Sequence, residues 1–152
     1  MAESQFQLAQ INIARMVAPL DDPIMTEFVA NLARINALAD ASPGFVWRLQ
    51  SEAGNATNLR PYDATILVNI SVWENAEYLR DYAFRSEHVE IMRKRKQWFD
   101  QFKGAYTALW WVPLGCTPTV EEAKARLEHL RVHGESPYAF SFKKLFLPSQ
   151  SE

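Results

Sequence analysis

The strongest constraint on the fold is the segment from Ala64 to Trp73, in which two sets of side chains alternate. Successive side chains of a β-strand point to opposite faces of a sheet, so strict alternation predicts a strand. One face of this strand is wholly aliphatic: Ile66, Val68, Ile70 and Val72. The other face mixes apolar and polar side chains: Leu67, Asn69, Ser71 and Trp73. The two faces of the predicted sheet therefore have different environments.

Around this strand the sequence predicts the element order β-α-β-β-α-β, followed by an extra helix and a short strand. The strands are expected at residues 6–16, 45–50, 64–73 and 106–112, with the short last strand at 138–142. Helical spacing of apolar residues is found at 23–39, 74–84, 86–102 and 119–133. This order defines an α+β, ferredoxin-like fold, a four-stranded antiparallel sheet with two helices on one face.

Local signals support these boundaries. Asp22 and Pro23 are a typical helix start, and Ser42-Pro43-Gly44 ends that helix. Thr119-Val120-Glu121-Glu122 is a capping box for the last helix. Ser51 to Asp63 is polar and rich in turn residues, so we expect a long and mobile hairpin loop.

The aliphatic face of the third strand predicts a homodimer. Two helices can cover only one face of the sheet, which would leave Ile66, Val68, Ile70 and Val72 uncovered. An apolar patch of that size on a soluble chain needs a partner. A second copy packed sheet to sheet, with two-fold symmetry, is the simplest solution.

Length and composition limit the class of protein. The 152 residues fit one domain, which we assign to residues 1–147, with a flexible tail at 148–152. A net charge of −2 gives no preference for nucleic acid or membrane, and Arg93-Lys94-Arg95-Lys96 would spread around a helix as a solvated surface. Cys116 is the single cysteine, and the first residues lack a leader pattern, so we expect a cytoplasmic protein.

Polar residues on several strands predict a small-molecule pocket. Alternation places Gln10 with Asn12 on the first strand and Arg48 with Val46 on the second. If these share a face with Asn69, Ser71 and Trp73, they line a cavity with polar groups inside an apolar wall. The helix stripes add Asn36 and His88 to the same interior. Alternatively, backbone groups satisfy each polar side chain, or it lies at a sheet edge.

His88 is the sharpest catalytic candidate. It lies in the first turn of a predicted helix, where the helix dipole favours a neutral imidazole that can act as a base. A core or capping role is the alternative. Arg48 is costly in an apolar strand unless it binds a ligand carboxylate or phenolate, or pairs with Asp63, Glu74 or a partner subunit.

Two other patterns in the sequence bear on ligand binding. Trp73 and Trp98 could stack on an aromatic ligand, although tryptophans at strand or helix spacing are more often core residues. His129 and His133 have the i, i+4 spacing of metal ligands, but no third ligand is near them in the sequence. We therefore predict no metal site.

Several segments resemble the dimeric α/β barrel superfamily, which includes the antibiotic-biosynthesis monooxygenases. The resemblance begins with Val72-Trp73-Glu74-Asn75-Ala76-Glu77-Tyr78-Leu79 and Arg85-Ser86-Glu87-His88. The segments 8–15, 42–49, 71–74, 109–113 and 119–123, with the 140–142 tail, are similar to a bacterial family of unknown function within that superfamily.

The resemblance implies an enzyme that acts on an aromatic or polyketide-like compound, as a monooxygenase without a cofactor. His88 would be the base, with Asn12 and Arg48 as further catalytic residues. The substrate-binding candidates are Asn36, Asn69, Ser71, Trp73, Tyr82 and Trp98.

The alternatives are a haem protein with His88 as axial ligand and a non-catalytic binder of small ligands. In haem-degrading members of the superfamily, the resemblance aligns Asn12 with an asparagine and Tyr82 with a tryptophan. His88 falls about one helical turn before their histidine.

Overall fold

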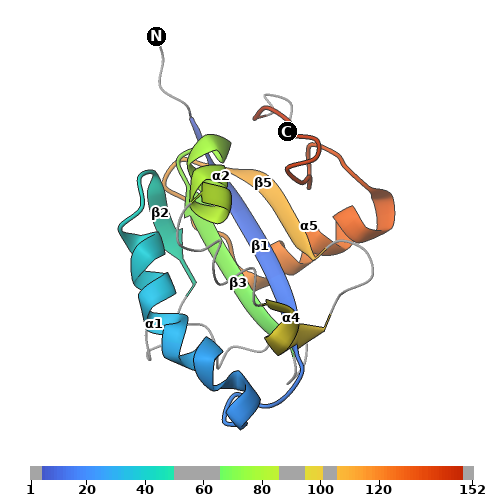
Figure 1. Cartoon of the computed structure of the whole chain (residues 1–152). Coiled ribbons are helices and arrows are strands. Elements are labelled where there is room, and N and C mark those ends of the chain that lie inside the picture. Colours follow the sequence, from blue (N-terminus) through green and yellow to red (C-terminus); the bar gives the residue numbers. More distant parts are fainter. Residues whose placement is uncertain (1–4, 50–65, 86–94, 101–105, 149–152) are drawn as a thin grey trace.

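A computed structural model describes residues 5–49, 66–85, 95–100 and 106–148 (Figure 1). Its strands are β1 (Phe6–Met16), β2 (Phe45–Arg48), β3 (Ile66–Trp73), β4 (Phe99–Asp100) and β5 (Thr107–Pro113). Its helices are α1 (Thr26–Asp40), α2 (Ala76–Arg85), α4 (Arg95–Trp98) and α5 (Val120–His133), with a 3-10 turn η1 (Pro23–Met25). None of the helices in these ranges is long and apolar enough to cross a membrane.

The strands form one antiparallel sheet with β1 at its centre. β3 pairs with one edge of β1, and β2 pairs with the outer edge of β3. The other edge of β1 pairs with β5 along most of its length. The resulting order, β2-β3-β1-β5, confirms the predicted α+β, ferredoxin-like fold.

The free end of β1 binds a strand that the sequence did not predict. Arg15 and Met16 pair with Asp100 and Phe99 of β4, beyond the last pair between β1 and β5, which is Asn12 with Thr107. The helix predicted to reach Phe102 is therefore wrong at its end, because α4 stops at Trp98. Phe99 contacts Phe28 of α1 edge to face, with ring centroids 5.1 Å apart, so tertiary packing overrides the helical pattern here.

The turn that follows α1 brings the second helix close to the sheet. The predicted N-cap holds, since the Asp22 side chain accepts a hydrogen bond from the Ile24 backbone amide at 3.0 Å. After α1 ends, Gly44 adopts a φ of 80°. A Cβ at this position would collide with the Tyr78 ring of α2, so only glycine allows this approach.

The helices occupy both faces of the sheet, as Figure 1 shows. The side chains of α1 and α2 cover the face that carries Leu8, Trp73 and Leu109. On the opposite face, α5 packs its buried side chains Ala123, Leu127 and Leu130 against the aliphatic side chains of the sheet. That aliphatic face carries Ile66, Val68, Ile70 and Val72, which are at most 5% exposed within the single chain.

The premise of the predicted sheet-to-sheet dimer is therefore wrong. The sequence showed the last helix, but its apolar positions did not reveal which surface it would cover. Because α5 folds back, the aliphatic face is buried without a second copy.

The predicted last strand is reduced to two isolated antiparallel bridges, Ala139 with Ser136 and Phe140 with Leu109. The second has reciprocal backbone hydrogen bonds of 2.7 and 2.9 Å. Two other expectations, the mobile loop at 51–63 and the inward orientation of His88, fall outside the described residues.

The packing of α5 predicts a large loss of stability on truncation of its buried face. Leu127 is 1% exposed, so Leu127→Ala should lower the free energy of unfolding by about 2–5 kcal/mol. Val132→Ala on the same helix is the control, because Val132 is 62% exposed and its truncation should cost less than about 0.5 kcal/mol. Urea unfolding measures both, and equal losses would contradict the placement of α5.

A homodimer stays a prediction, which now rests on the family resemblance alone. We expect light scattering at micromolar concentration to give twice the mass of the chain. A monomer mass under those conditions would contradict the predicted dimer. It would not change the finding that α5 buries the aliphatic face.

Candidate functional site

The face of the sheet under α1 and α2 carries polar side chains at its centre. We call Gln10, Asn12, Asn69 and Ser71 the polar strip. In the register between β1 and β3, Gln10 lies opposite Ser71 and Asn12 lies opposite Asn69. Cross-strand partners point to the same face, so the four side chains are neighbours on one surface.

Hydrogen bonds connect Gln10, Asn69 and Ser71 to one another, and Ser71 is also bonded to Trp73. The Gln10 Nε2 group donates to Asn69 Oδ1 at 2.6 Å and to Ser71 Oγ at 2.8 Å. The Trp73 Nε1–H donates to the same Ser71 Oγ at 2.9 Å. Gln10 and Ser71, each 6% exposed, are the only polar side chains in the described ranges that are classed as buried. Their mutual bond offsets the cost of burying them.

The polar strip has a buried end and an open end. Ser71 is buried, whereas Asn69, which lies beyond the part of β3 that pairs with β2, is solvent-exposed. Its neighbours Val68 and Ile70 point to the opposite face and are buried there. Asn69 is therefore the member of the strip that is open to solvent, and a small molecule could reach the strip at this point.

Two apolar clusters flank the polar strip. The Trp73 cluster has a buried core of Leu8, Ala39, Trp73, Leu79, Leu109 and Phe140, with Phe45, Tyr82 and Trp111 packed against it. The Trp98 cluster consists of Met16, Met25, Leu67 and Trp98, with Phe28 and Phe99 packed against them. The predicted ligand-stacking tryptophans thus lie in separate clusters, and each is only 1% exposed.

Trp73 is held on three sides. Its ring stacks on Tyr82 with centroids 5.1 Å apart and meets Phe45 edge to face at 5.4 Å. Its indole N–H donates a hydrogen bond to Ser71 Oγ. Trp73 therefore orients Ser71 and forms a wall, and it does not present a free ring face for stacking.

Arg48 lies beside the buried end of the strip. It is opposite Ser71 in the β2–β3 register, so it points to the same face. Its Nε and Nη2 groups donate to Asp40 Oδ1 at 2.8 Å and Asp40 Oδ2 at 3.3 Å. The Arg48 side chain is 10% exposed and that of Asp40 is 47% exposed. Asp40 was not among the partners that the sequence suggested.

Tyr82 links the two helices above the sheet. Its hydroxyl donates to the Ile35 carbonyl of α1 at 3.3 Å. Burial raises the pKa of Tyr82 to about 12, with a smaller opposing effect from Arg48 and a smaller raising effect from Asp40. A phenol of this kind stays protonated at neutral pH and serves as a donor.

The remaining candidates are less closely connected. Asn36 is half-buried on α1, one residue after the carbonyl that Tyr82 binds. Asn12 is half-buried within the strip, opposite Thr107 on its other side. His88 lies outside the described residues.

Sequence reasoning did not single out two residues of this arrangement. Gln10 shared the polar face in the prediction, but alternation could not show that it would bond to Ser71 and Asn69. Asp40 is the last residue of α1, and only the tight turn into β2 brings it to Arg48, eight residues later. An acidic residue at a helix end just before a strand arginine is a weak signal of such a pair.

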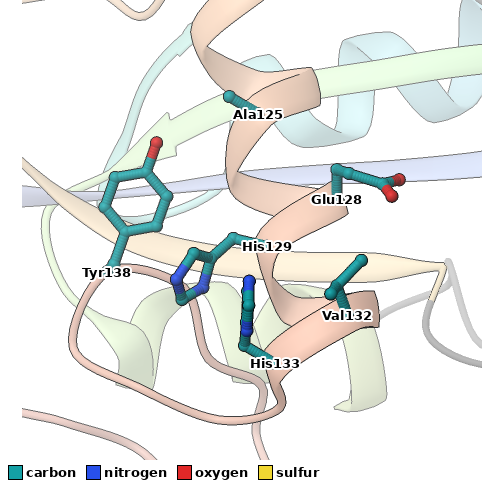
Figure 2. A pocket seen from close by; sticks show the side chains of 6 residues that line it. All are labelled: Ala125, Glu128, His129, Val132, His133 and Tyr138. Atoms are coloured by element: carbon teal, nitrogen blue, oxygen red, sulfur yellow. The ribbon is translucent and has the colours of Figure 1, made fainter.

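A hollow lies on the outer surface of α5, on the other side of the sheet (Figure 2). The rings of His129 and His133 lie 4.7 Å apart, and the His129 ring also contacts Tyr138 at 4.7 Å. In the part of the chain that the structure describes, no three His, Cys, Asp or Glu side chains converge as metal ligands. None of the candidates for substrate binding lines this hollow.

The sequence matches a known domain family over residues 7–152. That family is described as a domain of unknown function, DUF3291, and the chain belongs to it. The resemblance to a family of unknown function is thereby confirmed. No curated protein matches the sequence.

Solved structures with a similar arrangement include three that differ widely in sequence. NE2512 of Nitrosomonas europaea, a protein of unknown function, is 10% identical, with a TM-score of 0.48 over 76% of this chain and 95% of its own. SnoaB of Streptomyces nogalater, a cofactor-independent oxygenase, is 15% identical, with a TM-score of 0.45 over 75% and 96%. PA3566 of Pseudomonas aeruginosa is 15% identical, with a TM-score of 0.48 over 74% and 97%.

Because the phenol of Tyr82 is buried, we expect it to ionise at a higher pH than an ordinary tyrosine. The absorbance difference between the wild type and Tyr82→Phe should show one tyrosine that ionises near pH 12. Because the folded pKa lies above the ordinary value of 10.0, the stability from Tyr82 is complete below pH 10 and declines as the pH rises to 12. A difference curve with its midpoint near pH 10 would mean that the Tyr82 hydroxyl is not buried against α1.

Proposed function

We propose that this protein binds a small aromatic or polyketide-like molecule at the open end of the polar strip and acts on it as a cofactor-independent monooxygenase. The observation that carries the proposal is the hydrogen-bonded set Gln10, Asn69 and Ser71 on the sheet. It is buried at Ser71, open at Asn69 and flanked by apolar clusters. A few placed polar groups within apolar surroundings are typical of small-molecule sites.

The surroundings suit a planar ligand with oxygen substituents. Apolar rings would lie against the exposed parts of the two clusters, where half-buried side chains such as Phe28 and Tyr82 meet the solvent. The ligand oxygens would contact the amide and hydroxyl groups of the strip. Arg48 lies beside Ser71, so a positive charge is close to that point, although Asp40 balances part of it.

The proposed reaction needs no bound redox group because the substrate supplies the electrons. A base removes a proton from an activated CH2 group, and His88 is proposed for this role. Asn12, Asn69 and Arg48 would stabilise the negative charge that develops on the conjugated oxygen. Reaction with O2 then converts the CH2 group to C=O, and the second oxygen atom leaves as water with both hydrogens.

Anthrone provides a direct test, since its CH2 group is oxidised to the carbonyl of anthraquinone with one O2 consumed and one water formed. We expect the protein to accelerate oxygen uptake above the buffer rate. His88→Ala should lower the turnover rate by at least about 10²-fold, the usual contribution of a general base. His133→Ala is the matched control, because His133 is exposed on the far side of the sheet and should not affect turnover.

Other outcomes of the same preparation would replace the proposal. Anthrone binding without oxygen uptake would favour a non-catalytic binder of small ligands. A Soret band in the purified protein would favour the haem alternative. Full activity of His88→Ala would remove His88 as the base and leave the proposed site without its catalytic residue.

A further inference from the structure

We propose that Gln10 is a positioning residue that fixes the direction of the hydrogen bonds in the polar strip, so that the strip offers donors to its ligand. The ligand oxygen would then be bound as an anion or a carbonyl, and not as a neutral hydroxyl. This inference rests on the proposed function, because it assumes that the ligand reaches the strip.

The amide of Gln10 sets the direction of the hydrogen bonds in the strip. A glutamine side chain has two N–H donors on one atom and an acceptor oxygen on the other. Both donors of Nε2 are in use, one to Asn69 Oδ1 at 2.6 Å and one to Ser71 Oγ at 2.8 Å. The amide therefore cannot rotate by half a turn without changing the role of both neighbours.

The bond from Gln10 also limits how the Ser71 hydroxyl can form hydrogen bonds. A serine oxygen has two lone pairs and one proton. Gln10 and Trp73 donate to this oxygen at 2.8 and 2.9 Å, which uses both lone pairs. Within the described ranges no protein acceptor takes the remaining proton. Ser71 is thus left with a donor only.

Asn69 is restricted in the same way. Its Oδ1 accepts from Gln10, so its Nδ2 group, with two further donors, points away from Gln10. Asn69 is the exposed member of the strip, so these donors face the open end. A ligand that meets Ser71 and Asn69 encounters donors from both, and an anionic or carbonyl oxygen, which carries no proton, is the better complement to them.

The opposite orientation of Gln10 would give an acceptor site. Its Oε1 would then accept from Ser71 and Asn69, and the lone pairs of those residues would face the ligand. A neutral phenol could donate to such a site. The identity of residue 10 therefore decides which protonation state of the ligand is preferred.

The probe for the experiment is 4-nitrophenol, whose phenol and phenolate forms absorb at different visible wavelengths. In the wild type, donors from Ser71 and Asn69 should favour the phenolate, so the apparent pKa of bound 4-nitrophenol should fall below that of the free compound. We expect a preference of at least about tenfold in affinity for the phenolate.

Two substitutions of Gln10 separate the effect of hydrogen-bond direction from the effect of an added negative charge. Gln10→Glu can only accept, so it should reverse the preference and favour the neutral phenol. Gln10→Leu removes the donors without adding charge and should abolish most of the preference. Gln97→Glu on α4 is the control for added charge, because Gln97 is exposed and should leave the preference unchanged.

Ser71→Ala tests the inference even if substitutions of Gln10 prevent the protein from folding. It removes the proposed donor and should also weaken phenolate binding by about tenfold. Near-ultraviolet circular dichroism shows whether each variant keeps the packing of Trp73.

The results distinguish this inference from the proposed function. A wild type that prefers the neutral phenol, or a folded Gln10→Leu variant with an unchanged phenolate preference, would overturn the role of Gln10 while anthrone turnover stands. Absence of any 4-nitrophenol binding would overturn the inference as well. Failure of the proposed function is measured separately, as the absence of anthrone oxidation by the wild type.

Discussion

The antiparallel pairing of β1 with β3 is the constraint on which the rest of the structure depends. Its register puts Gln10 opposite Ser71 and Leu8 opposite Trp73 on one face, and Ile11 opposite Ile70 on the other. A slip by one residue would turn the side chains of the shifted strand to the opposite face and separate the two halves of the polar strip. The aliphatic residues of the second face hold the register, because their burial is lost if the strand shifts.

The two faces of the sheet then take separate roles. The face under α5 is filled mainly by aliphatic side chains, whose burial stabilises the sheet. At the centre of the face under α1 and α2, the polar residues Gln10 and Ser71 stand in place of apolar ones. They are buried and bonded to one another. Buried polar groups are costly, and a protein that keeps them at the centre of a sheet beside an open point is most simply explained by binding.

Much of this fold follows from sequence alternation, whereas the site depends on contacts that a pattern does not contain. Alternation predicts β1, β3, β5 and the separation of the polar from the aliphatic face, because side-chain direction in a strand is local. Packing between distant segments decides the strand at Phe99 and the position of α5, and the turn after α1 decides the pairing of Arg48 with Asp40. The direction of the Gln10 amide likewise depends on which neighbours fold against it.

The most direct test of the account is a two-dimensional proton–nitrogen NMR titration with 4-nitrophenol. The indole N–H of Trp73 bonds to Ser71, whereas the indole of Trp110 lies buried on the opposite face, so the two report on different sides of one sheet. The account predicts that the Trp73 indole signal and the side-chain amide signals of Gln10 and Asn69 shift together, while the Trp110 indole does not. Shifts confined to Trp110 and to α5 residues around His129, with Trp73 unchanged, would contradict it.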